Sequence, residues 1–141
     1  MRILFLMLLG ALLQACSSEQ QKEPFKSFLA NVNKAKIVLY NGGDSLNFET
    51  ADPNGLVILK RLISGNNNTA KDTCQPVGEI QYVAQDQQIM QAQFSLAETN
   101  GCNYVRYVHN NQQYQHKLTS RAENILKQVK QAASVPPKPA S

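Results

Sequence analysis

The sequence predicts a small single domain of the α+β class, in which two or three helices pack on one face of an antiparallel sheet. The prediction depends on a change of hydrophobic period. Apolar residues recur every three or four positions, as in a helix, near 25–32, 53–64 and 121–133, whereas they alternate with polar residues from 79 to 118. The apolar stripe of each helix must be buried, and one side of the sheet is the natural surface for it.

The first elements expected are a helix over 24–34 and a hairpin. Four apolar residues follow the i, i+3, i+4, i+7 pattern of the helix: Phe25, Phe28, Leu29 and Val32. Extended segments at Ile37–Tyr40 and Leu46–Thr50 then flank the sequence Asn-Gly-Gly-Asp at 41–44. Residues of this kind adopt the positive φ angles of a tight turn, so the two segments are predicted to form an N-terminal hairpin.

Two further helices carry recognisable start signals. Asp52 is a favourable N-cap, and the proline after it suits a first turn, so a helix is expected over 53–64 with Gly65 as its stop. A capping-box pattern, Ser-Arg-Ala-Glu from Ser120, opens the last helix at 121–133.

Four strands are expected between these helices, over 79–84, 89–96, 102–109 and 112–118, as an antiparallel meander. A register that keeps the apolar residues together defines a side facing the helices, with Ile80, Tyr82, Met90, Ala92, Phe94, Leu96, Tyr104, Val108, Tyr114 and Leu118. The opposite side is then predicted to carry Gln81, Gln91, Gln93, Asn103, Val105, Tyr107, His109, Gln113, Gln115 and Lys117.

The N-terminus has the pattern of an export signal. Arg2 precedes an apolar run of 11 residues, Ile3–Leu13. A membrane-spanning helix needs about 20 apolar residues, so this run fits the core of a secretory signal peptide, which is removed from the mature protein.

The tetrapeptide Leu13-Gln14-Ala15-Cys16 resembles the lipobox of bacterial lipoprotein precursors. The resemblance implies cleavage before Cys16, a diacylglycerol on its thiol and an acyl chain, such as palmitate, on its new amino group. An ordinary signal peptide cut elsewhere is the alternative. Two or more acyl chains, as the lipobox resemblance implies, anchor a protein stably to a bilayer. The expected organisation is a signal peptide at 1–15, a flexible tether at 16–24, a single domain at 25–133 and a disordered Pro-rich tail at 134–141.

The resemblance also implies a location in the cell envelope, lipid-anchored and facing the periplasm. In many Gram-negative bacteria, Ser rather than Asp after the acylated Cys accompanies sorting to the outer membrane, and here Ser17 follows Cys16. Cys74 and Cys102 remain beyond the anchor, and an isolated pair outside the cytoplasm is expected to form a disulfide. The alternatives are a zinc site, which needs two more close ligands, and a catalytic thiol, which needs a nearby base.

No catalytic constellation, metal site or cofactor motif is recognisable, so we do not expect an enzyme. Removal of residues 1–15 leaves 13 Lys and Arg against 10 Asp and Glu, too mild a charge for a nucleic-acid-binding protein. The expected function is a protein-interaction or accessory module that binds the bilayer and another envelope protein. The alternative is a module that binds a glycan or small ligand. The candidate binding face is the polar side of the sheet: Tyr107 and His109, with Gln91, Gln93 and Gln115.

Overall fold

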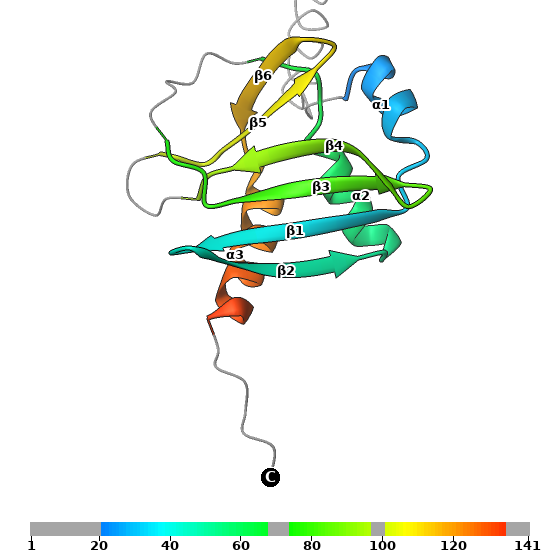
Figure 1. Cartoon of the computed structure of the whole chain (residues 1–141). Coiled ribbons are helices and arrows are strands. Elements are labelled where there is room, and N and C mark those ends of the chain that lie inside the picture. The colour runs from blue at the N-terminus through cyan, green and yellow to red at the C-terminus, as the bar shows by residue number, and fades with distance from the viewer. Residues whose placement is uncertain (1–20, 68–73, 97–100, 135–141) are drawn as a thin grey trace, which may run out of the picture.

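The computed structural model describes residues 21–67, 74–96 and 101–134 and confirms the α+β class (Figure 1). It contains nine elements: α1 (Glu23–Leu29), β1 (Lys34–Asn41), β2 (Asp44–Thr50), α2 (Pro53–Arg61), β3 (Gly78–Ala84), β4 (Gln87–Phe94), β5 (Tyr104–His109), β6 (Gln112–Lys117) and α3 (Ser120–Ala133). The predicted signal peptide, Cys16 and residues 135–141 of the predicted tail lie outside the described residues.

The six strands form one antiparallel sheet in the order β2-β1-β3-β4-β5-β6. The four-strand meander predicted from the sequence is therefore the β3–β6 part of a larger sheet. The N-terminal hairpin completes it, because β1 pairs with β2 on one side and with β3 on the other. Since β2 and β3 both run antiparallel to β1, they are parallel to each other, and α2 connects them across one face.

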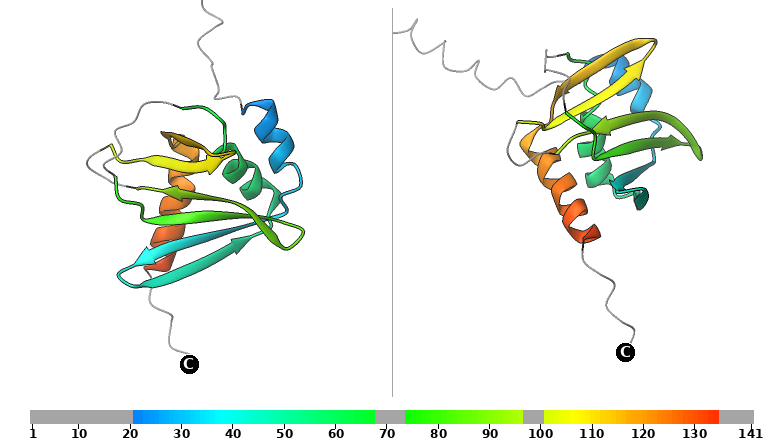
Figure 2. Two further views of the ribbon diagram at one scale, coloured as in Figure 1. Left: turned by 45° about the horizontal axis from the view of Figure 1, so that its top comes forward. Right: turned by 60° about the vertical axis from the view of Figure 1, so that its left-hand side comes forward.

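Helices α2 and α3 lie on the same face of the sheet, here called the helix side (Figure 2). The core lies between this face and the helices, and its most deeply buried large side chains are Tyr82, Phe94, Leu29, Leu59, Leu62, Ile63, Ile80 and Leu126. Helix α2 begins at the expected cap, because the Asp52 carboxylate accepts a hydrogen bond from Gly55 N at 2.7 Å. Helix α3 begins one residue earlier than expected: its N-cap is Thr119, whose hydroxyl accepts a hydrogen bond from Ala122 N at 3.3 Å, and Ser120 is the first helical residue. We call the opposite side of the sheet the outer face.

The predicted register of β5 is wrong by one residue. In the structure Ala92 pairs with Tyr107 and Phe94 with Val105, so both β5 residues share the helix side with their partners. Val105 is fully buried and Tyr107 is 3% exposed, whereas Val108, which was expected inside, is 61% exposed. The two alternating sets of this strand are nearly equal in apolar content, so apolar content did not determine which set is buried.

The disulfide between Cys74 and Cys102 is confirmed. The two Cα atoms lie 5.6 Å apart, and the bridge closes a 28-residue separation that contains β3 and β4. It joins the segment before β3 to the segment before β5, at one end of the sheet. Because the loop-entropy model predicts about 3 kcal/mol for a loop of this order, the bridge is a substantial part of the stability of a domain this small.

The ordered domain begins earlier than the predicted boundary at 25. The side-chain amide of Gln21 donates to the backbone carbonyls of Lys60 and Ile63, at 2.8 and 2.9 Å, and Lys22 N donates to Ser64 O at 3.0 Å. These bonds join the residues before α1 to the last turn of α2 and to the segment that follows it. The part of the predicted tether from Gln21 onward is therefore attached to the domain at the end of α2.

Gly65 allows α1 to pack against the segment that follows α2. Its φ angle is +76°, a region that favours glycine, and a Cβ at this position would lie 2.5 Å from two ring carbons of Phe25. Phe25 is itself 4% exposed, so its ring has little room to move away. The glycine that was expected only to end the second helix is thus also the contact surface for the first.

We expect Gly65→Ala to lower the free energy of unfolding by about 2–5 kcal/mol, from the positive φ and the overpacking together. Gly101→Ala is the matched control, because Gly101 also has a positive φ, +65°, but nothing lies within 4 Å of its added Cβ. That control should cost only about 1–2 kcal/mol. Urea denaturation of both variants with the disulfide intact measures the difference, and equal losses would contradict the proposed contact.

Candidate binding groove on the outer face

The sheet forks between β4 and β5. Only three residue pairs join these strands, from Ala92–Tyr107 to Phe94–Val105, although β4 extends back to Gln87. Beyond the pair Ala92–Tyr107, toward the β5–β6 turn, the hairpin of β5 and β6 rises away from β4 (Figure 1). The facing edges of β4 and β5 therefore diverge, and in the described residues no other strand pairs with them there.

Helix α1 supports the fork from the helix side. Phe25 and Phe28 both contact the ring of His109, with centroid distances of 5.0 and 4.7 Å. Phe25 also meets Tyr114 edge-on at 5.2 Å. These aromatic contacts hold the β5–β6 hairpin at its angle to the rest of the sheet.

A groove of about 520 Å³ lies at the fork. Its lining residues are Gln91, Gln93, Arg106, Tyr107, Val108 and Gln113. Arg106 Nε donates a hydrogen bond to Gln93 Oε1 at 3.0 Å, which orients both side chains across the β4–β5 junction. The groove thus combines amide groups, a guanidinium and an exposed apolar side chain, that of Val108.

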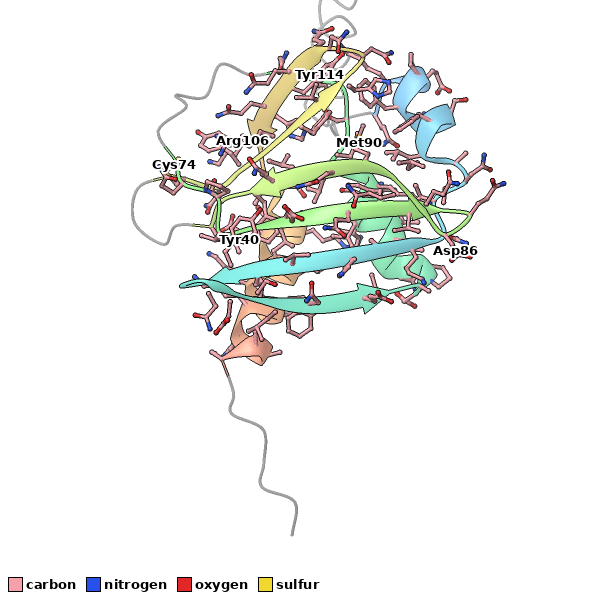
Figure 3. All side chains as sticks on the ribbon, in the orientation of Figure 1. Tyr40, Cys74, Asp86, Met90, Arg106 and Tyr114 are labelled. Carbon is pink, nitrogen blue, oxygen red and sulfur yellow. A yellow bond between two sulfur atoms is a disulfide. The ribbon has the colours of Figure 1, made fainter. Side chains whose placement is uncertain are left out.

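Glu79 organises the polar side chains next to the groove. It accepts hydrogen bonds from the Tyr40 hydroxyl and the Gln81 amide, both at 2.7 Å, and from the Gln91 amide. Partial burial, followed by this hydrogen bond and the charge of Glu79, raises the pKa of Tyr40. Tyr40 and Arg106 lie on the same face of the sheet, toward the viewer in Figure 3. Glu79, Tyr40, Gln81 and Gln91 therefore form one hydrogen-bonded cluster on the outer face, in which the carboxylate of Glu79 is already engaged by its neighbours.

Three of the five predicted binding-face residues, Gln91, Gln93 and Gln115, lie on the outer face. Gln91 and Gln93 line the groove, whereas Gln115 lines a small neighbouring pocket together with Gln93 and Arg106. The amides provide both hydrogen-bond donors and acceptors, which suits a polar ligand or a peptide backbone.

The other two predicted residues are corrected, because they lie on the helix side. The Tyr107 hydroxyl accepts a hydrogen bond from Gly65 N at 2.8 Å, and its ring stacks on Tyr114 with centroids 5.2 Å apart. Burial raises the pKa of this hydroxyl. His109 lies against Phe25 and Phe28. Tyr107 is thus buried and His109 is half-buried against α1, so neither side chain belongs to the outer face as the sequence reasoning proposed.

Arg106 and Val108, not Tyr107 and His109, present their β5 side chains on the outer face at the groove, and sequence reasoning missed both. The signal was available in Arg106, because an arginine is almost never fully buried unless it is paired. Placing it on the outer face fixes the whole strand, since a shift of one residue reverses every side chain.

A buried polar pair lies on the helix side, away from the groove. Ser64 Oγ and His116 Nε2 are 3.3 Å apart, and the two residues are 1% and 2% exposed. A serine nucleophile must reach its substrate, so burial gives this pair a structural role. It attaches the segment after α2 to β6, next to the bond between Gly65 and Tyr107.

In the residues that the structure describes, no group of three or more His, Cys, Asp or Glu side chains could hold a metal ion. Among its described helices, none is long and apolar enough to cross a membrane. Comparisons of the chain with protein-family models, with curated proteins and with solved structures found no match. The functional argument therefore depends on the residues and their geometry.

The register of β5 predicts opposite outcomes for two neighbouring residues. We expect Tyr107→Ala to lower the free energy of unfolding by about 3–5 kcal/mol, because it empties a buried aromatic site and leaves Gly65 N without its acceptor. Val108→Ala should cost less than about 1 kcal/mol, because this side chain is exposed. Chemical denaturation monitored by circular dichroism tests both, and a reversed order would mean that the strand faces the other way.

Proposed function

We propose that the protein is a lipid-anchored envelope protein whose outer face binds another envelope protein, as an accessory module. The lipobox-like sequence supports the anchor, with acyl chains on Cys16. The fork between β4 and β5 supports the binding role and is the observation on which the proposal depends. Ser17 supports the outer membrane, facing the periplasm, as the location.

The groove suits an extended segment of a partner protein. Its walls are diverging strand edges, and peptide segments commonly bind by adding main-chain hydrogen bonds to an open edge, with neighbouring side chains giving specificity. Gln91, Gln93 and Gln113 can bond a peptide backbone, while Arg106 selects for a carboxylate or carbonyl and Val108 for an apolar contact.

The anchor would hold the domain close to the membrane with its groove facing away from the bilayer. Gln21 is fixed to the end of α2 on the helix side. Five chain steps separate it from Cys16, a reach of about 18 Å at full extension. The helix side would therefore be turned toward the bilayer, and the outer face away from it, toward partners in the periplasm.

A glycan-binding module is the second candidate, supported by the amide-rich lining. Amides hydrogen-bond sugar hydroxyl groups as readily as they bond a peptide. The shallow shape and Val108 favour the protein partner, since an exposed valine contributes an apolar contact that a sugar hydroxyl does not use.

The anchor is tested by mass spectrometry of the protein extracted from membranes. We expect residues 1–15 to be absent and acyl chains to be present on Cys16. Cys16→Ser should release the protein from the membrane fraction or leave its signal peptide uncleaved. A soluble wild-type protein with an unmodified Cys16 would overturn this part of the proposal.

The groove is tested by photo-crosslinking in intact envelopes, with a photoreactive residue in place of Val108. Val57 is the matched control, because it is also an exposed valine, 48% against 61%, but lies on α2. We expect a discrete adduct from position 108 whose digest contains peptides of a second protein, and this adduct should be absent from position 57 and weakened by Arg106→Ala. An adduct whose added mass is removed by a glycan hydrolase supports the glycan candidate, and no specific adduct contradicts both.

A further inference from the structure

The two edges of the sheet differ in how they are covered. At the β6 edge, the side-chain amide of Asn67 donates to Gln113 O at 3.3 Å and accepts from Gln115 N at 2.8 Å, as a neighbouring strand would. At the other edge, β2 pairs only with β1 among the described residues. Five of its seven residues are exposed. The edge of β2 is therefore open.

The alternation of the ladder shows which backbone groups of β2 point outward. Tyr40 N donates to Val77 O, on the side of β3. Tyr40 therefore does not exchange hydrogen bonds with Ser45, its partner in β2, and the backbone groups of Ser45 point away from β1. By the same alternation, Asn47 and Glu49 also present their N–H and C=O groups outward. The sequence of β2, Asp-Ser-Leu-Asn-Phe-Glu-Thr, contains neither the proline nor the lysine that commonly protects an edge.

We propose that β2 pairs with β2 of a second copy of this chain, antiparallel, to form a continuous twelve-stranded sheet. The register follows from the strand itself. The only antiparallel register that pairs all seven residues of β2 with those of the second copy has Asn47 on the two-fold axis. This register places the outward-facing residues opposite one another, as the hydrogen bonds require: Asn47 opposite Asn47, and Ser45 opposite Glu49.

The side chains of β2 are self-complementary in this register. On the helix side, Leu46 lies opposite Phe48 of the second copy, so two partly exposed apolar groups cover each other. Both carboxylates meet hydroxyl groups: Asp44 lies opposite Thr50, and Glu49 lies opposite Ser45. No like charges face each other, whereas a register centred on Glu49 would place two carboxylates together, which is destabilising. The last turn of α3 projects past β2 (Figure 1), so it would extend the contact on the helix side.

The symmetry of the pair is compatible with one membrane. A two-fold axis through an antiparallel strand pair in a continuous sheet is perpendicular to the sheet. Both copies therefore have their outer faces on one side and Gln21 on the other. If the chain is anchored as in the proposed function, on which this step rests, both anchors reach the same bilayer and both grooves face away from it.

The test is cysteine crosslinking of the full chain in its native membrane. Residues paired across the axis have Cα atoms about 5.5 Å apart, within the range of about 4.4–6.8 Å that a disulfide allows. We expect Asn47→Cys to form a covalent dimer on mild oxidation. Ser45→Cys is the matched control. Position 45 lies opposite position 49 of the second copy, so the two residues 45 are four residues apart along the strand, about 13 Å, and should not crosslink. The wild-type chain controls for Cys16. Crosslinking at 45 but not 47, or at neither, overturns the proposal.

Charge substitutions at Ser45 give an independent test that forms no new covalent bond. Ser45→Lys places an ammonium group opposite Glu49 of the second copy, and Ser45→Glu places a carboxylate there, twice per dimer. The dimer dissociation constant, measured by fluorescence energy transfer in proteoliposomes, should fall for the first variant and rise for the second, each by about two- to thirty-fold. Equal changes of the dissociation constant in the two variants would overturn the proposed register. Retained crosslinking at position 47 without any adduct at Val108 would contradict the groove alone, because the pairing of β2 does not depend on it.

Discussion

The hydrogen bond from Gly65 N to the Tyr107 hydroxyl is the interaction on which the arrangement of the domain depends. It joins the segment after α2 to β5 and requires Tyr107 to point toward the helices. Phe25 occupies the space beside Gly65 and contacts Tyr107 edge-on at 6.0 Å, so α1 is tied to the same point. With Tyr107 inside, Arg106 must point outward. The chemistry of the groove is therefore determined by a buried contact on the opposite side of the sheet.

Sequence periodicity predicted the elements that depend on local signals. The cap at Asp52 and the disulfide between Cys74 and Cys102 required only a short-range pattern or the pairing of two cysteines, and the start of α3 was predicted to within one residue. The place of the hairpin in the sheet is long-range, because nothing local to Ile37 indicates that β1 lies between β2 and β3. The helix expected at 24–34 ends at Leu29, although Val32, three residues further on, is also buried, with an exposed fraction of 3%. Burial continues beyond the end of the helix, and the spacing of apolar residues alone cannot distinguish a buried helical residue from a buried residue that follows the helix.

The candidate site was predictable only in part, for a reason specific to β5. Its two faces carry Tyr104 and Val108 or Val105 and Tyr107, sets of almost the same hydrophobicity. The deciding partner, Gly65, lies 42 residues away in the sequence, and its backbone N–H leaves no sequence pattern. Residues in β4 posed no such difficulty, because Gln91 and Gln93 alternate with clearly apolar neighbours. Strands with one polar set were assigned correctly, and the strand with two amphipathic sets was not.

The proposed anchor would strengthen the proposed pairing of β2, because it raises the effective concentration of the chains. A seven-residue antiparallel contact with two apolar pairs is small beside the interfaces of stable dimers, so it is weak between freely diffusing molecules. Chains confined to one membrane meet at a much higher effective concentration, and the second contact then forms without the full loss of translational freedom. The same confinement would align the proposed two-fold axis with the membrane normal in advance. A weak, open edge such as β2 is therefore compatible with a monomer in dilute solution and a dimer on the bilayer, and the paired molecule would offer two grooves to one partner.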